Sequence, residues 1–195
     1  MSQKVKNSGS RTFNSMKNII MGFMSQGIVL GVGFVNRIVF TRCLTAEYLG
    51  VNGLFTNILS MLSLAELGIG TAIVYALYKP LAEKNEKEIA ILMNYFAKAY
   101  KVIGCVVAVV GVLLLPFLDL LIGATPNIEE NIYVIYLLYL FNTSLSYFFT
   151  YKSSLLTADQ KNYVLTSIYS GIMVLQCVLQ CIILVFTQNY ILYLV

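Results

Sequence analysis

Long apolar segments alternate with short polar segments along the 195 residues of the chain. We predict that each apolar segment is a helix that crosses a membrane, because about 20 apolar residues in a helix cover the roughly 30 Å of hydrocarbon in a bilayer. None of the segments shows the alternation of apolar and polar residues that is typical of barrel strands. The five predicted spans are residues 18–40, 51–78, 102–118, 132–151 and 163–186.

Basic residues fall almost entirely in alternate loops of this predicted threading. With the amino terminus in the cytoplasm, 11 of the 13 Lys and Arg lie on the cytoplasmic side. Segment 119–131, on the opposite side, has acidic residues but no basic residue. Because positively charged flanks stay in the cytoplasm during insertion, we expect a multi-pass membrane protein with its amino terminus in the cytoplasm.

The composition supports this fold class. The chain is 58% hydrophobic and 11% charged, with a mean hydropathy of +0.78, which excludes a soluble globular domain of this length. The net charge of +4 does not indicate a nucleic-acid partner, because membrane topology already accounts for where the cations lie. We therefore expect one all-α integral membrane domain over residues 1–195.

Two further segments complete the predicted organisation. Residues 81–101 become amphipathic at helical spacing after a charged start, so we expect a cytoplasmic helix on the membrane surface that runs into the third span. A new apolar run begins at Tyr190 and extends to the last residue. We expect it to be the start of a truncated sixth span, and the chain to be the amino-terminal portion of a longer protein.

Charged side chains inside the predicted spans are candidate functional residues, because each costs at least ~2.5–3.5 kcal/mol near a helix centre. Arg37 lies near the outer end of the first span and shares a face with Gly22, Gln26 and Gly33, whereas Glu66 lies past the middle of the second. Two structural interpretations stay open: stripes of small residues also mark close helix packing, and Arg37 can extend outward to the headgroups.

The second, fourth and fifth predicted spans also have polar flanks, and we expect these three helices and the first to surround a hydrated groove. The residues concerned are Ser60, Ser63 and Gly70 in the second span, Asn142, Thr143, Ser144 and Ser146 in the fourth, and Thr166, Ser170, Gln176 and Gln180 in the fifth.

Enzymatic chemistry is not indicated by the sequence. The chain has no His, no phosphate-binding glycine loop and no paired carboxylates, so we predict neither catalytic residues nor a cofactor. Cys177 and Cys181 are spaced to share a helix face, but nothing near them in sequence completes the four ligands of a metal site. We predict that they pack between helices and bind no metal.

Several segments resemble bacterial polysaccharide flippases. Residues 44–55 (LTAEYLGVNGLF) resemble the first outer loop of these proteins, and residues 58–73 (ILSMLSLAELGIGTAI) resemble their second span, in which an acidic residue, a hydrophobe and a glycine precede small residues. Segments 11–19, 78–82 and 151–156 also resemble segments of these flippases. The chain therefore resembles the Wzx-type oligosaccharide flippases of the multidrug/oligosaccharidyl-lipid/polysaccharide exporter superfamily.

This resemblance implies half of a MATE-like transporter: five transmembrane helices and the start of a sixth, forming one lobe beside a central cavity. It implies alternating-access transport of undecaprenyl-pyrophosphate-linked oligosaccharide repeat units during the synthesis of O-antigen, capsule or exopolysaccharide. The implied partners are the lipid-linked oligosaccharide, the lipid bilayer, a polysaccharide polymerase and glycosyltransferases. The alternatives are a cation-coupled multidrug antiporter of the same superfamily, a non-functional truncated fragment, and a small membrane scaffold.

Three residues are candidates for the substrate pathway of such a transporter. Arg37 and Arg42 flank the first outer loop, and guanidinium groups bind phosphate with paired hydrogen bonds, so we expect both to attract a pyrophosphate. Glu66 occupies the acidic position of the second span. We expect it to pair with an arginine or to exchange H⁺ or Na⁺ during transport.

Overall fold

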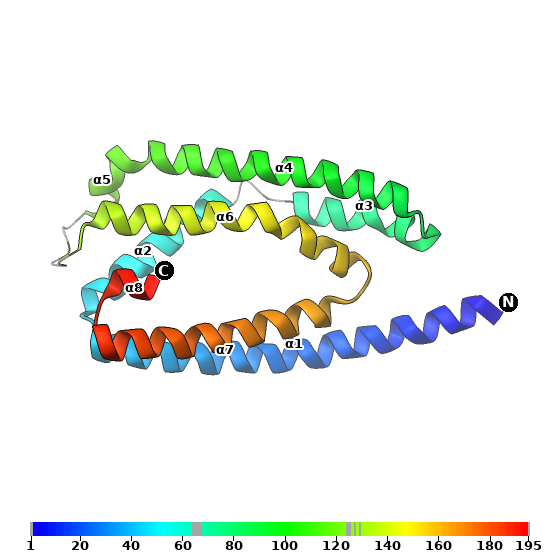
Figure 1. Ribbon diagram of the computed structural model, residues 1–195, viewed down its shortest axis with the longest axis horizontal. Coiled ribbons are helices and arrows are strands. Elements are labelled where there is room, and N and C mark those ends of the chain that lie inside the picture. Colours follow the sequence, from blue (N-terminus) through cyan, green and yellow to red (C-terminus); the bar gives the residue numbers. More distant parts are fainter. Residues whose placement is uncertain (1, 64–67, 124–125, 127, 129, 195) are drawn as a thin grey trace.

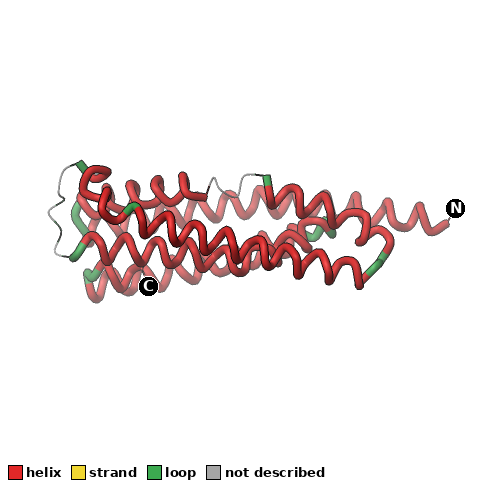
Figure 2. Tube along the Cα trace, turned by 90° about the horizontal axis from the view of Figure 1, so that it is seen from above, coloured by secondary structure: helices red, strands yellow, loops and turns green. Residues whose placement is uncertain are grey.

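The computed structural model describes residues 2–63, 68–123, 126, 128 and 130–194 of the chain, with side chains from residue 15 onward. Within these residues all regular structure is helical, which confirms the predicted all-α class (Figures 1 and 2). The helices are α1 (Ser2–Cys43), α2 (Ala46–Leu62), α3 (Ile69–Glu83), α4 (Glu86–Leu113), the 3₁₀ turn η2 (Leu115–Phe117), α5 (Leu118–Ile122), α6 (Ile132–Ala158), α7 (Asn162–Thr187) and α8 (Tyr190–Leu194).

Four helices in the described residues are long and apolar enough to cross a membrane. They are Ser15–Cys43 of α1 and the whole of α4, α6 and α7, with 26 to 29 residues each. They correspond to the first, third, fourth and fifth predicted spans. Large apolar side chains such as Phe23 (78% exposed) and Phe186 (82% exposed) lie on their outer faces, as expected of helices in contact with lipid. A multi-pass membrane protein is thus consistent with the described structure.

The second predicted span, residues 51–78, is formed by two helices in the described structure. α2 has 17 residues and α3 has 15, and residues 64–67 between them lie outside the described part. Gly68 precedes α3 with a φ of 84°, a left-handed conformation that glycine adopts without strain. The predicted helix is therefore interrupted at Gly68, although α2 and α3 still follow one another along the bundle (Figure 1).

The prediction for residues 81–101 is confirmed in part: a helix runs into the third span, but it is the first half of α4 and not a separate surface helix. α3 continues through Pro80 to Glu83, and α4 then runs without a break for 28 residues. Its first turn is fixed by Asn85, whose side-chain oxygen accepts a hydrogen bond from the Glu88 N–H at 3.3 Å. The apolar residues of the amphipathic segment contact the protein core, which explains why it does not form a separate helix. These residues are Ile89, Leu92, Met93 and Phe96.

The third predicted span also ends earlier than expected, because α4 stops at Leu113 and Pro116 lies in the following 3₁₀ turn. Proline has no N–H for a helical hydrogen bond.

The helices form two groups. α1 packs mainly against α7, and α4 and α3 pack mainly against α6, with fewer contacts between the groups (Figure 1). α4 approaches α6 closely at two glycines: a Cβ at Gly104 would lie 3.2 Å from the Ser144 carbonyl oxygen, and one at Gly111 would lie 2.2 Å from Leu140 Cδ1. Tyr136 of α6 donates a hydrogen bond to the Gly111 carbonyl at 2.9 Å. Small residues at such contacts are typical of membrane helix pairs.

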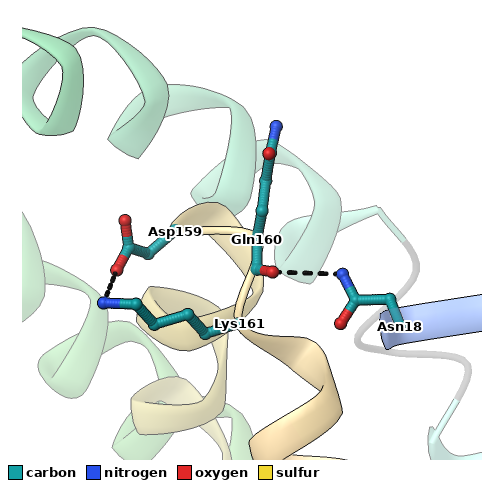
Figure 3. A network of polar contacts seen from close by, with 4 residues as sticks. All are labelled: Asn18, Asp159, Gln160 and Lys161. Carbon is teal, nitrogen blue, oxygen red and sulfur yellow. Dashed lines mark hydrogen bonds and ion pairs between the residues drawn. The ribbon is translucent and has the colours of Figure 1, made fainter. Parts of the chain in front are cut away.

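Polar side chains hold α1 against α7. Asn18 donates to the Gln160 carbonyl at 3.1 Å in the turn between α6 and α7, where Lys161 and Asp159 form an ion pair of 2.6 Å (Figure 3). The Asn18 side-chain oxygen also accepts from the Tyr163 N–H at 2.7 Å. The α1–α7 pair is therefore anchored at the predicted cytoplasmic end by one asparagine.

Candidate functional site

A small polar cavity lies between α1, α2 and α8, at the end of the bundle where α1 finishes. Its volume is about 170 Å³, and it is partly open to the outside. The sequence builds it from helix positions that share one face of α1 and one face of α2, closed by the first aromatic residues after α7. The lining residues are Gly33, Asn36, Arg37, Phe40, Leu49, Asn52 and Tyr193.

Asn36 connects three helices at this cavity. Its Nδ2 donates to Gln180 Oε1 of α7 at 3.2 Å and to the Tyr193 hydroxyl of α8 at 3.1 Å. Its Oδ1 atom is buried and has no hydrogen-bond partner among the described residues. An acceptor left in this state costs about 1–3 kcal/mol, so the amide lowers the stability of the bundle through Oδ1 while it bridges the helices through Nδ2.

The opposite wall of the cavity is held in place by tyrosines. Tyr139 of α6 donates to Asn52 Oδ1 at 2.7 Å and lies 3.3 Å from the Tyr190 hydroxyl. The Phe40 ring meets the rings of Tyr190 and Tyr193 edge-on, at centroid distances of 5.9 and 5.3 Å. These contacts fix the orientation of the Asn52 amide and of the Tyr193 hydroxyl toward the cavity.

Arg37 is the charged residue of the cavity lining. Its side chain is exposed, and no ion pair involves it within the described part of the chain. A guanidinium group presents several N–H donors in a fixed plane that suits carboxylate and phosphate oxygens. The cavity therefore combines a cation with amide and hydroxyl groups, an arrangement that favours an anionic ligand with its own hydroxyl groups.

The other two predicted pathway residues do not lie at this cavity. Arg42 is exposed in the last turn of α1 and is not part of the lining. It lies five positions beyond Arg37, which turns it by roughly 140° around the helix axis. Glu66 lies outside the described residues, so its predicted role stays a prediction.

The predicted stripe of small and polar residues on α1 is exposed. A Cβ at Gly22 or Gly33 would meet no atom within 4 Å, and Gln26 is solvent-accessible. No described helix of this chain packs against these glycines. The stripe is therefore not the α1–α7 contact, which instead includes a hydrogen bond of 2.6 Å between Ser25 and Ser170.

The polar flanks of the later helices are divided between exposed and buried positions. Asn142, Ser146 and Gln176 are exposed, whereas Ser170 is buried against α1. The Ser146 hydroxyl donates to the carbonyl of Thr143 in its own helix at 2.7 Å. The wider groove between four helices stays a prediction, because the lining of the described cavity comes from α1, α2 and α8.

Cys177 and Cys181 lie close together, with 3.9 Å between their sulfur atoms. Cys177 is buried and its thiol lies 3.7 Å from the Val32 carbonyl of α1. Among the described residues, no group of three or more metal-ligating side chains is placed to hold an ion. The cysteines thus contribute to packing between α1 and α7.

Asn36, Asn52 and Tyr193 line the cavity but were not singled out from the sequence. Asn36 could have been found from the sequence, because it is a polar residue next to Arg37 inside an apolar segment. Tyr193 had no such signal, because its run of aromatic and aliphatic residues resembles the start of a span.

No family model matches the sequence, and comparisons with curated proteins and with solved structures give no significant match.

Proposed function

We propose that the protein takes part in moving undecaprenyl-pyrophosphate-linked oligosaccharide repeat units across the bacterial cytoplasmic membrane. The observation behind this proposal is the cavity that combines Arg37 with Asn36, Asn52 and Tyr193 at one end of a bundle of candidate membrane helices. The resemblance of residues 44–55 and 58–73 to polysaccharide flippases supports it.

The chemistry of such a substrate fits the cavity. A sugar-pyrophosphate head group cannot cross hydrocarbon unaided, whereas its prenyl tail can remain in the lipid. Arg37 would pair with pyrophosphate oxygens through paired N–H donors. The Asn52 amide and the Tyr193 hydroxyl, both in the lining, would form hydrogen bonds with sugar hydroxyls. At about 170 Å³ the cavity is smaller than the ~300–1,000 Å³ of typical ligand pockets, so it would hold one part of the head group at a time.

Arg42 and Glu66 have secondary roles in this proposal. Arg42, exposed at the end of α1, would attract the pyrophosphate before or after it contacts Arg37. Glu66 would couple transport to H⁺ or Na⁺ by exchanging the cation as the helices move.

Deletion of the gene from its source bacterium tests the function. We expect undecaprenyl-pyrophosphate-linked oligosaccharide to accumulate on the cytoplasmic side and surface polysaccharide to be lost. Lipid-linked oligosaccharide that stays at its normal level after deletion would refute the proposal. Loss of cationic dye extrusion with normal polysaccharide would instead identify a multidrug antiporter.

Complementation of the deletion strain tests the cavity. We expect Arg37→Gln to restore at least about tenfold less polysaccharide than the natural chain, because hydrogen bonds to charged groups are worth ~1.5–3 kcal/mol. Arg37→Lys, which keeps the charge without the planar donors, should be intermediate. Lys79→Gln removes an exposed cation outside the cavity lining and serves as the control. Full restoration by Arg37→Gln at equal expression would exclude Arg37 from the pathway.

A further inference from the structure

An apolar groove lies on the exposed face of α4, with lysines at its predicted cytoplasmic end. The groove is shallow, and its lining residues all come from α4: Lys101, Val102, Cys105, Val106, Val109 and Val110. Val102 is 63% exposed and Val109 is 59% exposed. Lys98 lies one turn before Lys101 on the same face of the helix and is also exposed.

These two lysines have no acidic partner. The sequence has no Asp or Glu between Ile89 and Leu118, and no ion pair of Lys98 or Lys101 occurs in the described part of the chain. An ammonium group beside an apolar face needs an anion or water to offset the cost of its charge. The positive charge at the end of the groove is therefore available to a ligand.

The contact between α4 and α6 gives the depth of the lysines in the membrane. Gly104 lies against Ser144, and Gly111 lies against Leu140, so the two helices are antiparallel in this register. With equal rise per residue in both helices, Lys98 lies at about the height of Lys152. Because the fourth predicted span ends at residue 151, the lysines lie near the headgroups of the cytoplasmic leaflet and the valines extend into its hydrocarbon.

We propose that this groove binds one anionic phospholipid of the cytoplasmic leaflet, with the phosphate at Lys98 and Lys101 and an acyl chain along the valines. The distance from Lys101 to Val110 along the helix is roughly 13 Å, close to the ~15 Å of hydrocarbon in one leaflet. A zwitterionic lipid would bring a cation of its own to the lysines. The proposal depends on α4 crossing the membrane and is independent of the transported substrate.

Selective quenching of a single tryptophan tests this site, since the natural chain contains no Trp. The full chain with Val106→Trp is reconstituted in bilayers that contain brominated phosphatidylglycerol or brominated phosphatidylcholine. We expect phosphatidylglycerol to bind more strongly near this position, by about fivefold for each lysine that contacts the phosphate. The same chain with Lys98→Gln and Lys101→Gln should quench equally with both lipids.

Two controls separate a site from general attraction to a basic protein. Lys84→Gln with Lys87→Gln removes the same charge, from the end of α3 and from the first turn of α4, and should keep the selectivity. Val178→Trp places the probe on α7, where Val178 is 50% exposed, and should show no preference between the lipids.

Three results would overturn the proposal. Equal quenching by both lipids in the V106W chain would show that the groove has no preference for anionic lipid. Selectivity that persists after both lysines are replaced would show that they do not hold the phosphate. Absence of quenching by either lipid would show that protein, such as a second copy of the chain, covers this face.

Discussion

The closest contact between α4 and α6 makes Gly111 the most informative position for a stability test. A Cβ at Gly111 would lie 2.2 Å from Leu140 Cδ1 and 2.7 Å from Leu140 Cδ2, whereas carbon atoms pack best at about 3.5–4.0 Å. Leu140 is only 3% exposed, so its side chain must move against other packed residues rather than into solvent. Gly111→Ala must therefore shift Leu140 or separate the helices.

Two matched Gly→Ala substitutions give the expected change in the free energy of unfolding. Overpacking of a filled core costs about 1–3 kcal/mol, while replacing Gly by Ala inside a helix gains about 1 kcal/mol. Gly27 in α1 is also helical, but a Cβ there would meet nothing within 4 Å. We expect Gly27→Ala to be neutral or stabilising and Gly111→Ala to be about 1–3 kcal/mol less stable than Gly27→Ala.

Unfolding by sodium dodecyl sulfate in maltoside micelles, followed by circular dichroism, measures this difference. Leu140→Ala provides a second test: alone it should cost about 2–5 kcal/mol, but it removes the atoms that a methyl at residue 111 would meet. In a chain that already carries Leu140→Ala, Gly111→Ala should not lower the free energy of unfolding. The reasoning is refuted if Gly111→Ala is as stable as Gly27→Ala, or if its cost persists when Leu140 is absent.

Three further predictions concern polar contacts and use the same unfolding assay. Ser25→Ala should lower the free energy of unfolding by about 0.6 kcal/mol, the typical value of a hydrogen bond between membrane helices. Ser146→Ala loses only a hydrogen bond within its own helix and should lower it less. Equal effects of the two substitutions would contradict the Ser25–Ser170 contact between α1 and α7. Tyr193→Phe should cost about 0.5–1.5 kcal/mol, because the Asn36 Nδ2 donor loses the Tyr193 hydroxyl oxygen. Unchanged stability would show that this hydrogen bond is not formed. Asp159 raises the pKa of Lys161, first through their hydrogen bond and then through charge attraction. This stabilisation is therefore present below the ordinary lysine pKa and lost as the pH rises through the raised value. The pair is exposed, so Lys161→Gln should cost at most ~1 kcal/mol at neutral pH and nothing well above the raised pKa; a constant difference at all pH values would contradict this.

The length of an apolar run could be predicted from the sequence more reliably than its boundaries. The segments 18–40, 132–151 and 163–186 fall within α1, α6 and α7, because hydrophobic composition and helix length are local properties. The boundary of α4 could not be predicted in this way. Its first half is amphipathic, and its apolar side contacts the core of the same protein rather than the membrane surface, a tertiary contact that hydropathy does not contain.

The candidate cavity shows the same limit. Arg37 could be found because a charge inside an apolar segment is unusual and expensive. Its neighbours in space could not, since Asn36 and Tyr193 are separated by 157 positions and meet only after α7 and α8 have packed. Arg42 lies close to Arg37 in sequence, yet the helix turns it away from the cavity lining.

The pairing of α1 with α7 has a consequence for biosynthesis. Asn18 and its partner Tyr163 are 145 residues apart, and ribosomes add about 5–20 residues per second, so the first helix waits roughly 7–30 s before its partner emerges. During that interval Ser25 and Asn36 have no α7 side chain to bond. A nascent chain arrested before α7 should therefore leave α1 accessible to the insertion machinery, and cross-linking from Ser25 should move from the translocon to the chain itself only when synthesis passes Ser170.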